Sequence, residues 1–266
     1  MATEMPFRLF SADLDGTLAG DREASRRFRR YWQSLAPTER PLLVYNSGRL
    51  IDDILAFTEE EELPRADALI GGVGTMLLSN SLPDIGEDYD RTLAETGYDA
   101  SRIEALIGTE HGIARQPERY QHRFKSSWYL HDASAQELDN LFAKLNDEGL
   151  SIRIVYSSNR DLDILPANAD KGAALAWLCE RIDVAPDEVI VAGDSGNDRS
   201  MFLMEGVRGI IPANGLAELT SLAKERDATI FRAQSKTADG VIEGLAHWSG
   251  GHKDTKAPDP NRFAQF

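Results

Sequence analysis

The 266-residue sequence is poor in cysteine and contains no long apolar run. Its one cysteine, Cys179, cannot form a disulfide within the chain, so we expect a reducing compartment, the cytoplasm. No apolar run approaches the roughly 18 residues that span a membrane. Residues 1–10 lack a basic segment followed by an apolar one, so we expect neither a membrane helix nor a secretory signal.

Basic residues are also scarce relative to acidic ones. The sequence has 29 Lys and Arg against 44 Asp and Glu, which gives a net charge of −15. This acidity argues against a nucleic-acid-binding protein, which would show a basic stripe, and an anionic membrane surface repels such a chain. We therefore expect no nucleic-acid or membrane partner. A small anionic ligand would bind only where local groups reverse the sign of the charge.

Short apolar runs alternate with amphipathic segments through residues 1–80 and 167–248. This alternation is typical of a Rossmann-like α/β core, in which helices cover a parallel sheet. The expected strands are 8–13, 42–46, 68–70, 188–194, 207–214 and 229–231. The expected helices are 23–35, 50–61, 171–182, 197–204, 216–225 and 238–248.

Residues 81–166 interrupt this pattern. They contain three expected strands, at 125–131, 151–158 and 162–166, with an expected helix at 134–148 between the first two. Such an insertion predicts a small α+β domain with its own sheet. Residues 249–266 are rich in glycine, proline and charge, which predicts a disordered tail.

Paired carboxylates follow the first expected strand, in the motif DLDGT. Asp13 and Asp15 are two positions apart at a strand end, where one carboxylate can attack and the other can transfer a proton. Gly16 permits the tight turn that follows. Open α/β sheets bind ligands at the carboxyl ends of their strands, so the motifs that follow other strands should lie nearby. Alone, DLDGT is also compatible with a simple polar turn.

Two further motifs offer groups suited to phosphate. In NSGR, the Ser47 hydroxyl and the Gly48 N–H open a helix and suit a phosphate oxygen, although an N-cap serine explains the motif equally well. Lys171 opens another expected helix, where a cation opposes the helix dipole. This unfavourable placement points to a functional charge, and a solvated lysine is the simpler alternative.

A second acidic motif, GDSGND, follows the expected strand at 188–194. Asp194 and Asp198 are four positions apart, and Gly196 bends the chain between them. Together with Asp13 they form a set of hard oxygen ligands suited to Mg²⁺. A charged turn is the alternative for this motif alone. The residue types, the order and the strand-end placement of the four motifs together favour one site.

The motifs DLDGT, NSGR, Lys171 and GDSGND resemble the four motifs of the haloacid dehalogenase superfamily of phosphatases. Residues 81–166 lie between the second and the third motif, as the C2-type cap does in that superfamily. The segments KSSWYLHD, VYSSNRDLDILP, ADKGAALAWL and VAGDSGNDRSMF are similar to its sucrose-phosphatase branch. This likeness extends over nearly the whole chain to Trp248.

Within that branch, YNSGRLIDD and GGVGTML resemble the bacterial enzymes that act on mannosylfructose phosphate. Ser47 stands where many plant sucrose phosphatases carry threonine, and both residues supply a hydroxyl. Leu50 stands where sucrose enzymes often have serine, a difference that bears on the sugar. The resemblance implies a phosphorylated disaccharide as the substrate, with mannosylfructose phosphate ahead of sucrose 6-phosphate.

The resemblance also implies a mechanism, in which the phosphoryl group passes through an aspartyl-phosphate. Asp13 would attack phosphorus, and Asp15 would protonate the leaving sugar oxygen and then activate water. Mg²⁺ would be held by Asp13, Asp194, the Asp15 carbonyl and, directly or through water, Asp198.

Neighbouring residues complete this implied site. Ser47 and the Gly48 N–H would bind phosphoryl oxygens, Lys171 would neutralise their charge, and Asn197 would orient the surrounding groups. Arg49 could hold phosphate, hold the sugar or pair with an acid, and the sequence does not separate these roles.

Sugar recognition is expected in the cap. Residues 113–130 form a basic stretch in an otherwise acidic segment, with Arg115, Arg119, Arg123 and Lys125. Lys125 resembles the cap lysine that contacts the sugar in the sucrose-phosphatase branch. The loop that ends in Gly74 and Thr75 resembles the loop that faces the sugar. A solvated strand face and a plain glycine turn are the respective alternatives.

Other functions fit parts of this pattern less well. A different sugar phosphatase, a phosphomutase and a non-catalytic sugar-phosphate sensor share the expected fold. A sensor would have lost catalytic residues, whereas every candidate residue is present here. We expect a monomer, because a small cap must be free to open and close.

Overall fold

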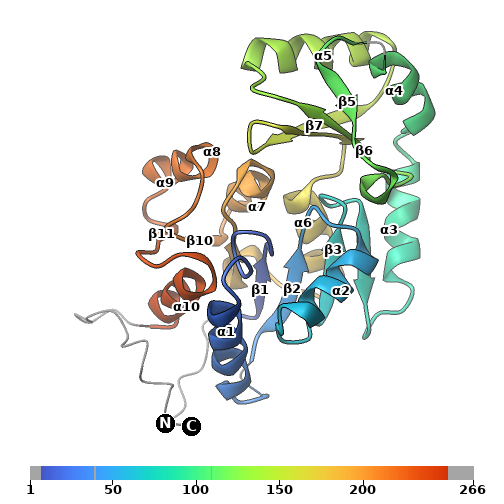
Figure 1. The fold of residues 1–266 in the computed structure, drawn as a ribbon. Coiled ribbons are helices and arrows are strands. Elements are labelled where there is room, and N and C mark those ends of the chain that lie inside the picture. Colours follow the sequence, from blue (N-terminus) through green and yellow to red (C-terminus); the bar gives the residue numbers. More distant parts are fainter. Residues whose placement is uncertain (1–6, 39, 109, 251–266) are drawn as a thin grey trace.

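The structure is a computed structural model that describes residues 7–38, 40–108 and 110–250. Figure 1 shows a large sheet flanked by helices and a smaller sheet with its own helices above it. Within the described ranges, no helix is long and apolar enough to cross a membrane. The predicted tail at 249–266 lies, from residue 251 onward, outside the described residues.

The larger sheet forms the core of the α/β part. Among the described residues it has seven strands, in the order β11 (Ile230–Arg232), β10 (Arg208–Ile211), β9 (Val189–Ala192), β1 (Leu9–Ala12), β2 (Leu42–Asn46), β3 (Ala68–Gly71) and β4 (Met76–Ser79). Neighbouring strands are parallel, except that β4 runs antiparallel to β3. The expected parallel sheet is therefore present, with an added antiparallel edge strand.

Both faces of the core sheet are covered by helices, which explains why its strands are mainly apolar. Leu9 of β1 packs into the hydrophobic cluster on one face, and Phe10 packs into the cluster on the other. The first face carries α3 (Ile85–Ala94), α6 (Lys171–Arg181), α7 (Arg199–Leu203), α8 (Ala217–Thr220) and α9 (Leu222–Glu225). The second carries α1 (Arg22–Ser34), α2 (Ile51–Glu60) and α10 (Thr237–Trp248).

The smaller sheet belongs to the cap. Its strands are antiparallel, in the order β5 (Ile113–Arg115), β6 (Ser126–Leu130), β8 (Asp161–Pro166) and β7 (Ile152–Ser157). Helices α4 (Ala100–Ile107) and α5 (Ala135–Asp147) cover one face around Trp128, and they lie on the side away from the core (Figure 1). The short 3₁₀ helix η1 (Glu118–Tyr120) also belongs to the cap, whereas η2 (Pro186–Glu188) and η3 (Gly196–Asp198) flank β9 of the core. The uncovered face of the cap sheet therefore turns toward the core.

Helix α3 differs from the sequence expectation. It lies within residues 81–166, yet its buried side chains Ile85, Tyr89 and Leu93 join the core cluster. Figure 1 also shows α3 beside the core sheet. By packing, α3 belongs to the core, because it follows edge strand β4 directly and covers the same face of the sheet. Elsewhere, the single helix expected at 216–225 is divided into α8 and α9.

Candidate active site

Strands β9, β1 and β2 are neighbours, so the loops that follow them meet at one edge of the core sheet. Asp13 follows β1, Ser47 follows β2, and Asp194 follows β9 by two residues. Lys171 begins α6, the helix that returns from the cap to this edge. The structure thus brings the four sequence motifs together.

Three carboxylates and one ammonium group form the centre of the site. Asp13, Asp194 and Asp198 each offer an oxygen atom, and these atoms all lie within 4.8 Å of one another. The fully buried Lys171 donates from Nζ to Asp13 Oδ1 at 2.7 Å and to Asp198 Oδ1 at 2.6 Å. The solvated-lysine alternative is therefore wrong, because this side chain points inward. The cluster holds more negative charge than one lysine neutralises.

The titration of these groups reflects that imbalance. Burial raises the pKa of Asp13 well above its usual value, although the Lys171 charge opposes the shift. Burial, followed by the charge of Asp198, raises the pKa of Asp194 to about 7. Burial by itself would lower the pKa of Lys171, but Asp13 and Asp198 outweigh it and leave that pKa above the usual value. A divalent cation with oxygen ligands fits this donor set.

Asp198 also organises the loop around it. Its Oδ2 atom accepts hydrogen bonds from the backbone N–H groups of Asp194, at 2.9 Å, and Ser195, at 3.0 Å. With Oδ1 held by Lys171, both oxygens of this fully buried carboxylate have partners. Asp194, by contrast, accepts one long hydrogen bond of 3.4 Å from Thr17. Asp194 is therefore the carboxylate with the most free coordination capacity in the loop.

Gly16 has a clear reason to be glycine. Its φ is +78°, and a Cβ there would overlap the carboxylate of Asp194. The adjacent turn is held by Asn214, whose Nδ2 donates to the Gly16 carbonyl at 2.7 Å. The expected tight turn is present, and the glycine additionally permits the close approach of the two acidic motifs.

Asp15 and Arg49 form a pair at the mouth of the site. The Arg49 Nε and Nη2 atoms donate to the two Asp15 oxygens at 2.7 and 2.8 Å, and Nη1 donates to Asp53 at 2.8 Å. The guanidinium also lies 3.7 Å from the centre of the Phe57 ring. Hydrogen bonding to Asp15 raises the pKa of Arg49 above its usual value. Of the roles left open for Arg49, the structure contains the pairing with an acid.

These residues open into a cavity of about 400 Å³ between the core and the cap. Ser47, Gly48, Arg49 and Asn197 line it, together with Asp13, Asp15 and Asp194. Ser47 is buried, and its Oγ accepts from Arg49 N at 3.2 Å. The N-cap of α2 is Leu50, so the alternative of an N-cap serine is wrong. The cavity is within the size range of small-molecule sites. A larger hollow of about 650 Å³ lies between α5, β7 and α7. It is not lined by the carboxylates of the DLDGT and GDSGND motifs.

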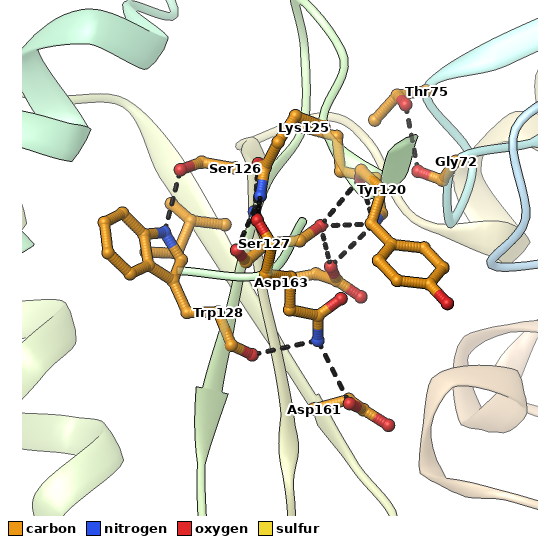
Figure 2. Close-up of polar contacts among 12 residues, drawn as sticks. Gly72, Thr75, Tyr120, Lys125, Ser126, Ser127, Trp128, Asp161 and Asp163 are labelled. Carbon is orange, nitrogen blue, oxygen red and sulfur yellow. Dashed lines mark hydrogen bonds and ion pairs between the residues drawn. The ribbon is translucent and has the colours of Figure 1, made fainter. Parts of the chain in front are cut away.

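Lys125 reaches the same cavity, but its ammonium group is already fully bonded. Nζ lies 2.9 Å from Asp163 Oδ1 and 3.0 Å from the Tyr120 carbonyl, and it donates to Ser127 Oγ as well (Figure 2). These three acceptors match the three N–H groups of a lysine. The side chain is buried, so a ligand would have to displace one of these partners.

Gly74 and Thr75 lie beside this network and do not line the 400 Å³ cavity. Thr75 is fully buried, and its hydroxyl donates to the Gly72 carbonyl at 2.9 Å (Figure 2). Gly74 has a φ of +87°, and a Cβ on it would overlap the Asp170 carbonyl. In this structure the loop supports α6 and the stem of Lys125.

The cavity is also lined by cap residues outside the predicted set. Those in β6 and β8 lie on the uncovered face of the cap sheet, as alternation along these strands requires, because Trp128, Leu162 and Ile164 face the cap helices. The polar residues on the cavity side are Gln116, Tyr120, Tyr129, Ser157, Ser158, Arg160, Asp161 and Asp163. The alternating segment DLDILP carried this signal in the sequence.

The other basic residues of the cap stretch have different surroundings. Arg115 pairs with Glu104 and Glu118, and Arg123 pairs with Asp90. Arg119 lies over the Tyr120 ring, 4.8 Å from its centre. Among the cap basic residues of the predicted stretch, Lys125 lines the cavity and these three arginines do not.

The geometry can be compared with known proteins. The family model for sucrose-6F-phosphate phosphohydrolase matches residues 6–249. The chain belongs to the sucrose-6F-phosphate phosphohydrolase family. It is thus a phosphoric monoester hydrolase, as the sequence motifs predicted.

Relatives of this phosphohydrolase agree with that assignment. Mannosylfructose-phosphate phosphatase of Agrobacterium fabrum is 53% identical over 91% of this chain and 97% of its own length. The structure of sucrose-phosphatase from Synechocystis sp. PCC6803, in complex with sucrose and phosphate, matches with a TM-score of 0.82 and 26% identity, over 91% of this chain and 98% of that one.

The fold extends to the wider superfamily. A haloacid dehalogenase subclass IIB sugar phosphatase matches with a TM-score of 0.62 at 11% identity, over 91% of this chain and 98% of that one. At such identity the likeness concerns the fold alone. The predicted haloacid-dehalogenase-like α/β core with a cap is confirmed.

Proposed function

We propose that this phosphohydrolase removes phosphate from a phosphorylated disaccharide, and that mannosylfructose phosphate is its preferred substrate. The observation that carries the proposal is the 53% identity to a mannosylfructose-phosphate phosphatase along nearly the full length of both chains. The cavity between core and cap supports it, since acidic and hydroxyl groups from both parts line one space. Sucrose 6-phosphate is the second candidate, because a sucrose phosphatase shares the fold closely.

Asp13 is proposed as the nucleophile. Lys171 holds its Oδ1 atom, and within the described chain no hydrogen bond occupies Oδ2, which leaves that oxygen for attack on phosphorus. The buried ammonium of Lys171 favours the ionised form of Asp13 and so opposes the desolvation that raises its pKa. The same lysine would neutralise charge on the phosphoryl oxygens.

Asp15 is proposed as the acid and then the base. Its side chain is 57% exposed at the cavity mouth, where a leaving sugar oxygen would sit. Both Asp15 oxygens accept hydrogen bonds from Arg49, so Asp15 must separate from Arg49 before one of them can carry a proton to the leaving group. We infer that the substrate draws Arg49 away from Asp15, which starts proton transfer only when the site is filled.

We propose that Mg²⁺ is held by Asp13, Asp194, the Asp15 carbonyl and, directly or through water, Asp198. When bound, the ion would supply charge stabilisation for the phosphoryl oxygens. The fit rests on the three clustered carboxylates and on the raised pKa of Asp194. Ser47, with the Gly48 N–H, would bind phosphoryl oxygens, and Asn197 would orient them.

The sugar is proposed to contact Lys125 directly, whereas Gly74 and Thr75 act on it indirectly. Lys125 fixes the orientation of Asp163 at the cavity wall and of the buried Ser127, and it can exchange one of its partners for a sugar hydroxyl. Gly74 and Thr75 hold the loop behind it. A monomeric state and a cytoplasmic location stay predictions.

The test compares phosphate release with Mg²⁺ from mannosylfructose phosphate and from sucrose 6-phosphate. We expect a higher kcat/KM for the first and no release from either by the Asp13→Asn variant, whose circular dichroism should match that of the wild type. Equal or negligible rates on both substrates would contradict the substrate assignment. Full activity of Asp13→Asn would contradict the mechanism.

A further inference from the structure

The hairpin between β7 and β8 joins the cap to the core across the mouth of the cavity. Three residues, 158–160, connect the paired Ser157 and Asp161, and the first two, Ser158 and Asn159, have φ values of +56° and +50°. The Ser158 N–H donates to Glu218 Oε1 at 2.9 Å. Since Glu218 lies on α8, a side chain of the core holds a backbone group of the cap.

Gly196 lies where these two segments meet. A Cβ on Gly196 would overlap Oε2 of Glu218 and would come within 3.0 Å of the Tyr156 carbonyl of β7. The sequence predicts a bend at this glycine in GDSGND, yet its φ is outside the positive region occupied by Gly16. Because Gly196 has no side chain, β7 of the cap and Glu218 can pack closely against the loop that carries Asp194 and Asp198.

Helix α8 is itself tied to that loop. The Leu216 N–H, at the start of α8, donates to the Asp194 carbonyl at 2.7 Å. Ser157, the last residue of β7, and Ser158 of the turn line the same cavity as Asp194 and Ser195. One continuous set of contacts therefore runs from the cap hairpin through Glu218 to the loop of the acidic motif.

We propose that Glu218 is a positioning residue that holds the cap closed over the bound sugar. The inference rests on the proposed phosphatase function, in which the cap contacts the sugar. A charge-assisted hydrogen bond from the Ser158 N–H to the Glu218 carboxylate stabilises the closed arrangement. A small phosphate ester that does not reach the cap gains nothing from this closure. Glu218 therefore affects the binding of the disaccharide phosphate and does not affect the chemistry at phosphorus.

The kinetic test uses three variants and two substrates. Glu218→Ala removes the acceptor, Glu218→Gln keeps a neutral acceptor, and Glu225→Ala is the control, because Glu225 is exposed on the adjacent α9. For Glu218→Ala we expect kcat/KM on mannosylfructose phosphate to fall about tenfold, mainly through KM, the size expected for one charge-assisted hydrogen bond. Hydrolysis of p-nitrophenyl phosphate should change less than twofold. Glu218→Gln should recover most of the loss, and Glu225→Ala should match the wild type.

A second measurement does not depend on activity. Amide hydrogen exchange at Ser158, followed by NMR in the substrate-free protein, should be about tenfold faster in Glu218→Ala than in the wild type. If the wild type hydrolyses neither disaccharide phosphate, the proposed function fails, and the exchange rate still tests the contact. Unchanged exchange at Ser158, or equal losses on both substrates, would overturn the role of Glu218. If Glu218→Ala does not fold, Glu218→Asp, which is one methylene shorter, carries the same expectations.

Discussion

Asp194 links the proposed metal site to the stability of the fold. Its pKa rises from 3.8 to about 7 in the metal-free chain, chiefly through burial. At about 1.4 kcal/mol per pKa unit, ionised Asp194 costs the folded state about 4 kcal/mol. The side chain is partly open to the cavity, so solvent screening reduces this cost, and we expect ~2 kcal/mol. Replacing Asp194 with asparagine should therefore stabilise the metal-free protein.

The pH dependence of this effect has a definite sign. The folded pKa of Asp194 lies above the unfolded one, so the folded state binds more protons between about pH 4 and 7, and stability falls as the pH rises through that window. Asparagine does not titrate. The advantage of Asp194→Asn should be near zero at pH 4 and reach ~2 kcal/mol at pH 8, or ~5 °C in Tm.

Thermal unfolding of both proteins in EDTA and in Mg²⁺, at pH 4.5 and pH 8, measures this advantage. Mg²⁺ should raise the Tm of the wild type more at pH 8 than at pH 4.5, and it should have little effect on Asp194→Asn. Asp227→Asn, at an exposed position, is the matched control. An Asp194→Asn variant that is no more stable than the wild type at pH 8 in EDTA, or whose advantage is already complete at pH 4.5, would refute this reasoning.

Three further variants test other parts of the site. Lys171→Met leaves two carboxylates without their partner, so we expect a loss of about 3–5 kcal/mol in urea unfolding and more than ~10³-fold in kcat; near-normal stability would contradict the buried pairing. Lys125→Met removes the charge that faces Asp163, and KM for the disaccharide phosphate should rise about tenfold while p-nitrophenyl phosphate hydrolysis is unchanged. A parallel loss on both substrates would place Lys125 in the core chemistry instead. Gly74→Ala forces a Cβ into the Asp170 carbonyl at a positive φ, so urea unfolding should show a loss of at least ~2 kcal/mol. An unchanged unfolding midpoint would show that the loop can relax.

The sequence predicted the parts of the site that depend on local patterns. Asp13, Ser47 and Asp194 follow apolar runs. Because the carboxyl ends of parallel strands lie at the same edge of a sheet, such residues are expected to meet there, without any knowledge of side-chain contacts. Lys171 stood out because a lysine at a helix start opposes the dipole, and its buried pairing accounts for that placement.

Contacts between distant segments could not be predicted in this way. Arg49 could pair with several groups, and the choice of Asp15 depends on the position of a side chain 34 residues away. The bonding of Lys125 depends on Asp163 from another strand. Likewise, α3 is amphipathic and could cover either sheet, so its place on the core follows from the edge strand before it and not from its own pattern.

The junction between β8 and α6 is short. Asp163, which lines the cavity, and Lys171, which holds Asp13, belong to one stretch of chain, in which only residues 167–170 separate the strand from the helix. A displacement of the cap that moves β8 therefore pulls directly on the residue that holds Asp13. A cap exchange that changes the length of this junction would shift Lys171 relative to Asp13, whereas a point substitution within the cap leaves the junction unchanged.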